Sequence, residues 1–113
     1  MAKADRLARY DEQRIEDEAE YRAALIAALK VTASGEWGLF DHNQDRWARA
    51  KAAPGLEALS DLAERIELLR GRLGMEPFQL HREFLAARGR PTSPSAVGEP
   101  KLARQWLERL GEG

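Results

Sequence analysis

The chain has 113 residues, with 18 Lys and Arg against 19 Asp and Glu, a formal net charge of −1, and no cysteine. This size predicts one domain, the charge balance gives no general attraction to nucleic acid or anionic membrane, and the missing cysteine excludes disulfides and thiol catalysis. Ala, Leu, Glu and Arg dominate while β-branched residues are scarce, so we predict an all-α fold. The patterns below give a bundle-like single domain of five helices.

The first twenty residues are charged throughout and lack the apolar core of a signal peptide. No apolar run approaches the roughly 20 residues that a membrane span needs. We therefore expect a cytoplasmic protein that makes no contact with a membrane.

The first predicted helix covers residues 4–33, where apolar side chains recur at alternating steps of three and four. Ser34 followed by a glycine is a suitable C-terminal stop. Large apolar residues are dense in the second half of this helix. The first twenty residues offer only three: Leu7, Tyr10 and Ile15.

The length of this helix exceeds the size of a compact domain. About 30 helical residues span about 45 Å, whereas a domain of this length has a radius of gyration of about 13 Å. Residues 1–18 are therefore expected to project, either as a solvated, partly frayed arm or as a helix that packs on another chain. In the second case Leu7, Tyr10 and Ile15 form part of the contact surface.

A second, short helix is predicted over residues 42–53. Asp41 and Gln44 have the spacing of a capping box at its start. Pro54 and Gly55 are expected to end it, since proline cannot donate the backbone hydrogen bond that a helix interior requires.

The aromatic residues have two alternative roles. Ala-rich helices need large partners to fill a core, so we assign Phe40, Phe84 and Trp106 to the core. Trp37 stands between two glycines and is either packed or presented to a partner. Together with Trp47 it could also line an aromatic pocket for a small molecule.

The remaining elements complete the predicted bundle. A strongly amphipathic helix over residues 55–73 and a shorter one over 77–88 are joined by a tight turn, with Pro77 at a favoured first helical position. We expect them to form an antiparallel hairpin against the apolar half of the first helix. Residues 90–99 form a loop rich in Pro, Ser and Gly, and a last helix follows over 100–110.

The hairpin turn carries a sequence resemblance. Residues 69–80, LRGRLGMEPFQL, resemble the turn of a helix-turn-helix DNA-binding motif, with Leu-Gly-Met at the turn, then Pro, then an inward-facing Leu80. Arg70 and Glu83 depart from that pattern, since the motif usually has a small and an apolar residue there. The same hairpin resembles the C-terminal part of some phage small terminase subunits, which are helical oligomers.

Arginines gather around this hairpin and are the candidates for phosphate contacts. They are Arg70, Arg72, Arg82, Arg88 and Arg90. The resemblance implies a DNA-binding or DNA-packaging accessory protein. An ordinary helical hairpin, which any bundle needs, is the alternative interpretation.

The sequence offers no constellation for catalysis or for a cofactor. His42 and Asp45 are three residues apart, but a metal site needs three or four converging ligands, and His81 is the only other histidine. No phosphate-binding glycine loop and no nucleophile motif are present. We therefore assign no catalytic, metal or cofactor residues and expect a protein that is not an enzyme.

Three functions remain compatible with the sequence. The first is a small interaction protein that self-associates, most simply as a dimer, through its first helix. The second is the DNA-binding or DNA-packaging role of residues 70–90. The third is a small-molecule sensor with a pocket near Trp37 and Trp47.

Overall fold

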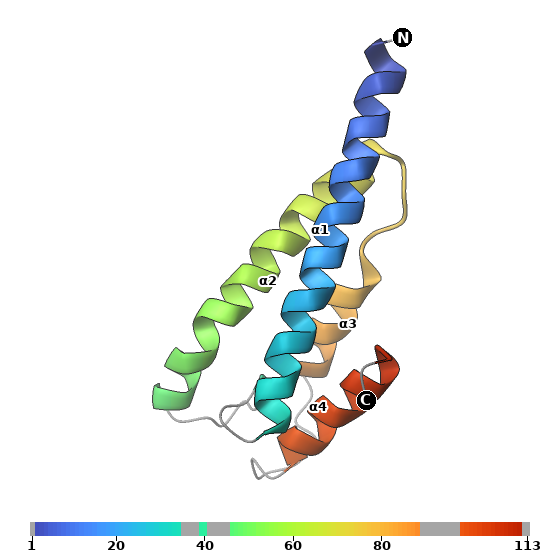
Figure 1. The fold of residues 1–113 in the computed structure, drawn as a ribbon. Coiled ribbons are helices and arrows are strands. Elements are labelled where there is room, and N and C mark those ends of the chain that lie inside the picture. Colours follow the sequence, from blue (N-terminus) through green and yellow to red (C-terminus); the bar gives the residue numbers. More distant parts are fainter. Residues whose placement is uncertain (1, 35–38, 41–45, 89–97, 112–113) are drawn as a thin grey trace.

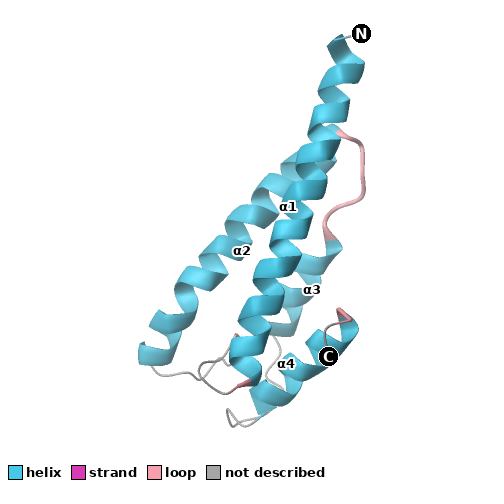
Figure 2. Cartoon of the chain, in the orientation of Figure 1, coloured by secondary structure: helices cyan, strands magenta, loops and turns pink. Residues whose placement is uncertain are grey.

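The computed structural model of this chain describes residues 2–34, 39–40, 46–88 and 98–111. Within these ranges every regular element is a helix and none is a strand, which confirms the all-α prediction (Figure 2). The four helices are α1 (Ala2–Ala33), α2 (Arg46–Arg72), α3 (Gln79–Arg88) and α4 (Gly98–Arg109).

Helix α1 forms the centre of the arrangement (Figure 1). α2 runs antiparallel along it, α4 packs against it, and α3 contacts α2. The molecule measures 56 × 28 × 20 Å and has a Cα radius of gyration of 16.0 Å. This exceeds the value of about 13 Å for a compact chain of similar length, because the N-terminal end of α1 extends past its neighbours (Figure 1).

The core is built on one stripe of α1. Tyr21, Leu25 and Leu29 recur every four residues and are fully buried, as expected for the inward face of a helix. Leu59 and Ile66 of α2 are buried opposite them. Each such side chain contributes about 1.5–3 kcal/mol by leaving water, so this seam is a main source of stability.

Aromatic side chains fill the part of the core that α3, α4 and residues 39–40 form. Phe40, Phe84 and Trp106 are buried, as predicted. The ring centroid of Phe84 lies 5.7 Å from that of Phe40 and 6.1 Å from that of Trp106, both in edge-on geometry that favours aromatic pairs. Trp37 and the side chain of Trp47 lie outside the described residues, so the predicted pocket there does too.

The predicted break at Pro54 and Gly55 is wrong. α2 continues through Pro54, so the two helices predicted on either side of it are one, and the described part of the chain has four helices rather than five. Proline removes one backbone hydrogen bond but its fixed φ is helical. Leu56 and Leu59 directly after it pack on the core, and packing of an apolar face outweighs local propensity.

The end of α2 is a Schellman turn. Gly74 adopts a φ of 69°, its N–H donates to Gly71 O at 3.2 Å, and Met75 N–H donates to Arg70 O at 2.9 Å. These two bonds satisfy carbonyls that the helix end would leave free. The glycine predicted to make a tight turn therefore does so, and α3 begins at Gln79.

Helices α2 and α3 run antiparallel in succession (Figure 1) and contact each other. α2 packs chiefly along α1, and residues 73–78 lead the chain from the end of α2 to α3 (Figure 1). Phe78 contacts Tyr21 of α1, with the ring centroids 5.0 Å apart. Its N–H donates to Glu67 of α2, so the start of α3 is held by both α1 and α2.

Candidate interaction site

Arg70 joins three parts of the fold. Its Nε and Nη2 atoms donate to the two carboxylate oxygens of Glu18 on α1, at 2.9 and 3.0 Å. Its Nη1 donates to Glu76 O in the turn at 2.8 Å, and its guanidinium lies 5.4 Å from the ring centroid of Phe78. This two-point geometry is the strong form of an ion pair, and it uses most of the donors that Arg70 has.

Glu18 receives a second arginine. Arg14, one turn earlier on α1, donates to it at 3.1 Å and also binds Asp11 at 2.8 Å. Burial by itself raises the pKa of Glu18, but the hydrogen bonds and charges of Arg70 and Arg14 outweigh burial and lower it. The Glu18 carboxylate therefore stays ionised between two cations.

The other arginines proposed for nucleic acid also make intramolecular contacts. Arg72 stacks over the ring of Tyr10 at 5.1 Å, and Arg82 lies 3.5 Å from Glu67. Arg88 donates from Nε to Leu39 O. Arg90 lies outside the described residues. The structure thus does not gather this set into one free basic surface.

A buried polar contact links α1 to α3. The Tyr21 hydroxyl and His81 Nδ1 are 2.6 Å apart, and burial raises the pKa of Tyr21. Burial also lowers the pKa of His81, more than the neighbouring charge of Glu67 raises it. We assign the Tyr21 hydroxyl as the hydrogen-bond donor and Nδ1 of neutral His81 as the acceptor, with the imidazole proton on Nε2. This contact orients α3 on the core.

Glu67 caps α3 from a different helix. Its Oε1 accepts a hydrogen bond from the backbone N–H of Phe78 at 3.0 Å, directly before α3 begins at Gln79. The first N–H groups of a helix have no partner within the helix, so this carboxylate replaces the usual local cap and suits the positive end of the helix dipole.

The residues proposed as an interaction surface differ in how far their side chains are exposed. Leu7 is 37% exposed and Ile15 54% exposed, whereas Tyr10 is half-buried beneath Arg72. Residues 3–9 are all exposed. At about 100° per residue, Ile15 lies about 80° around the helix from Leu7, so the two do not share one narrow stripe.

An open groove of about 420 Å³ lies between α1 and α2. Its lining residues are Gln13, Asp17, Glu20, Arg65, Leu68 and Leu69. The side chain of Asp17 is only 3% exposed. Its Oδ1 accepts from Gln13 Nε2 at 3.0 Å and lies 3.5 Å from Arg65, while its Oδ2 has no hydrogen-bond partner in the described part of the chain.

Asp17 and Glu18 received no role from the sequence patterns. The sequence did contain a sign that Asp17 is buried. Asp17 stands four residues before Tyr21 and eight before Leu25, on the stripe that forms the core. A charge at a core position is costly unless it is paired. Extending that stripe towards the N-terminus from its apolar half would have marked Asp17 as a buried carboxylate.

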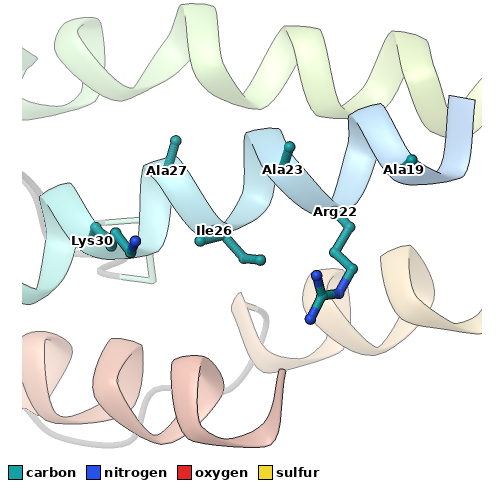
Figure 3. Close-up of a pocket in the computed structure, with 6 residues that line it drawn as sticks. All are labelled: Ala19, Arg22, Ala23, Ile26, Ala27 and Lys30. Atoms are coloured by element: carbon teal, nitrogen blue, oxygen red, sulfur yellow. The ribbon is translucent and has the colours of Figure 1, made fainter. Parts of the chain in front are cut away.

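A second groove, of about 480 Å³, runs along the outer face of α1 (Figure 3). Its floor is formed by Ala19, Ala23 and Ala27, and Arg22 extends from one edge (Figure 3). Arg22 is already engaged, since its Nη2 donates to Leu110 O next to α4. The groove is mostly apolar, and Arg22 and Lys30 are its charged lining residues.

No three His, Asp or Glu side chains of the described ranges lie together as metal ligands would. None of the four described helices is both long and apolar enough to cross a membrane. The chain matches no known protein family, no curated protein and no solved structure.

Proposed function

We propose that this protein is a helical interaction module that self-associates through α1. The observation that supports this proposal is the unbroken extension of α1 past its neighbours (Figure 1). Residues 3–9 keep helical structure although all of them are exposed. We call this segment the N-terminal arm.

The N-terminal arm extends a longer helix, and each residue added to a helix beyond its nucleus gains little free energy from its own hydrogen bond. The N-terminal arm also carries Leu7, a large apolar side chain with substantial exposure. A helix that continues without a partner in its own chain is stabilised most simply by a partner from another chain. A second copy is the simplest choice, since closed two-fold dimers are the commonest oligomers.

The experiment is light scattering of the full chain from low to high micromolar concentration. We expect a dimer, and a shift to monomer when residues 2–9 are removed. The deletion stops before Tyr10 so that the contacts of Arg72 and Glu18 with their partners stay intact.

The control is Leu85→Glu, because Leu85 is also a large exposed apolar residue, at 46%, but lies on α3. This variant is expected to remain dimeric. A full chain that stays monomeric at the highest concentration contradicts the proposal, and so does a deletion variant that remains a dimer.

The DNA-binding alternative has less support from the contacts described above. Arg70 and Arg88 are used to join helices and turns, and Arg72 and Arg82 have partners within the chain. The sensor alternative concerns Trp37 and the side chain of Trp47, which lie outside the described residues.

A further inference from the structure

One face of α1 carries charges that change sign along the helix. Arg6 and Arg9 are basic, Gln13 is neutral, and Asp17 and Glu20 are acidic. At about 100° per residue these five side chains fall within a sector of about 80°. We call them the α1 charge stripe.

The α1 charge stripe is antisymmetric about Gln13. Arg6 and Glu20 each lie seven positions from Gln13, and Arg9 and Asp17 each lie four positions from it. A two-fold axis through Gln13 would therefore place every basic residue of one copy opposite an acidic residue of the other. An isologous interface requires this kind of self-complementary surface.

We infer that two copies of this chain pair with their α1 helices antiparallel, crossing at Gln13, so that Arg6 binds Glu20 and Arg9 binds Asp17 of the other copy. This inference rests on the proposed self-association and names its contact surface. The N-terminal arm of the second copy would lie in the groove between α1 and α2.

Both halves of the α1 charge stripe contain charged groups that could accept a further partner. Arg6 and Arg9 are exposed, and neither forms an ion pair with another described residue. Asp17 Oδ2 is buried without a hydrogen-bond partner in the described ranges. A buried acceptor without a partner destabilises the fold, and Arg9 of a second copy in the groove that Asp17 lines would place a positive charge beside this carboxylate.

The acidic half of the α1 charge stripe is only weakly neutralised within the chain. Arg65 lies 3.5 Å from Asp17 and 3.9 Å from Glu20, and its side chain is 58% exposed. The Glu20 side chain is 65% exposed, so its 3.9 Å pair with Arg65 contributes little. Leu68, 57% exposed at the edge of the groove, adds apolar surface that a second helix would cover.

The test is a charge exchange between two exposed positions, Arg6→Glu and Glu20→Arg. Each variant alone brings like charges together twice across the two-fold axis. We expect each to raise the dimer dissociation constant at low salt by about tenfold or more. In an equimolar mixture, a heterodimer of the two variants keeps one Arg6–Glu20 contact as in the wild type. Its other contact pairs the new Glu at position 6 with the new Arg at position 20, so the charges are again opposite. We therefore expect a heterodimer of nearly wild-type affinity.

Matched controls are Arg104→Glu on α4 and Glu57→Arg on α2, which make the same charge changes at exposed positions away from the α1 charge stripe. They are expected to leave the dissociation constant unchanged. Asp17 is not substituted, because its burial makes loss of folding a competing explanation. Circular dichroism of each variant verifies that helix content is preserved.

The outcomes separate this inference from the proposed function. A wild-type dimer that neither variant weakens, or a mixture that fails to recover affinity, overturns the antiparallel pairing while self-association stands. A wild type that dimerises but is dissociated by Ile15→Glu and not by Arg6→Glu places the interface on another face of α1. A monomeric wild type overturns both.

Discussion

The guanidinium of Arg70 and the carboxylate of Glu18 meet through two hydrogen bonds, 2.9 and 3.0 Å long, although 52 positions separate them in sequence. Their side chains are 17% and 20% exposed, so water screens this pair less than a surface pair. The same arginine binds Glu76 O. One side chain therefore fixes the end of α2, the turn after it and the middle of α1 relative to one another.

Arg70→Lys is expected to lower the free energy of unfolding by about 1–2 kcal/mol, because lysine keeps the charge but cannot make the forked contact. The measurement is urea denaturation followed by circular dichroism. Arg72→Lys is the control, since Arg72 stacks over Tyr10 from an exposed position. If the two substitutions have equal effects, the forked geometry of Arg70 contributes no special stability.

Glu67→Ala is expected to lower the free energy of unfolding by about 1 kcal/mol, the usual cost of losing a helix cap. Glu67→Gln keeps an oxygen that can accept from Phe78 N–H and should retain most of the stability. Arg82→Gln removes the 3.5 Å ion pair of Glu67 alone and should have little effect. Equal losses for Glu67→Gln and Glu67→Ala would show that charge, rather than capping, stabilises α3.

Local periodicity was sufficient to predict the all-α fold and much of the core. The buried face of α2 follows from the spacing of Leu59, Leu62 and Ile66, and the burial of Phe84 and Trp106 follows from the need to fill space between small residues. These features depend on residues that are close in sequence, so the spacing of apolar residues is enough to predict them.

The features that periodicity missed depend on tertiary partners. Continuation of α2 through Pro54 depends on the packing that follows it, and Phe78 at the end of residues 73–78 contacts both Tyr21 and Glu67. Arg70 was assigned to phosphate because its partner Glu18 is distant in sequence. Spacing along the chain carries no information about which helices face each other.

The contact between Tyr21 and His81 predicts a pH dependence of stability. Burial lowers the pKa of His81 in the folded chain, with a smaller opposing effect of Glu67, whereas a histidine in the unfolded chain titrates at about 6.5. The unfolded state therefore binds a proton more readily. Stability from this group is fully present above about pH 6.5 and is lost as the pH falls below that value.

The measurement is the free energy of unfolding of wild type and His81→Asn across this pH range. The asparagine side chain can still accept a hydrogen bond from Tyr21 but does not titrate. We expect the difference between the two proteins to shrink or reverse as the pH falls, because only the wild type loses stability there. A difference that stays constant with pH would mean that His81 does not titrate differently in the two states.

Two neighbouring glycines at the end of α2 are predicted to respond oppositely to the same substitution. An added Cβ would meet no atom within 4 Å at Gly71 or at Gly74, so steric crowding by neighbours does not distinguish them. Gly74 has a φ of 69°, which costs an L-residue roughly 1–2 kcal/mol. Gly71 lies within the helix, where alanine is favoured by roughly 0.5–1 kcal/mol.

Gly74→Ala should therefore lower the thermal midpoint, and Gly71→Ala should raise it, when both are measured by circular dichroism under the same conditions. Because the Schellman bonds join Met75 N–H to Arg70 O, loss of the Gly74 conformation should also weaken the contact of Arg70 with Glu18. Gly74→Ala combined with Arg70→Lys is then expected to cost less than the sum of the two single changes. Strict additivity would show that the turn and the ion pair act independently.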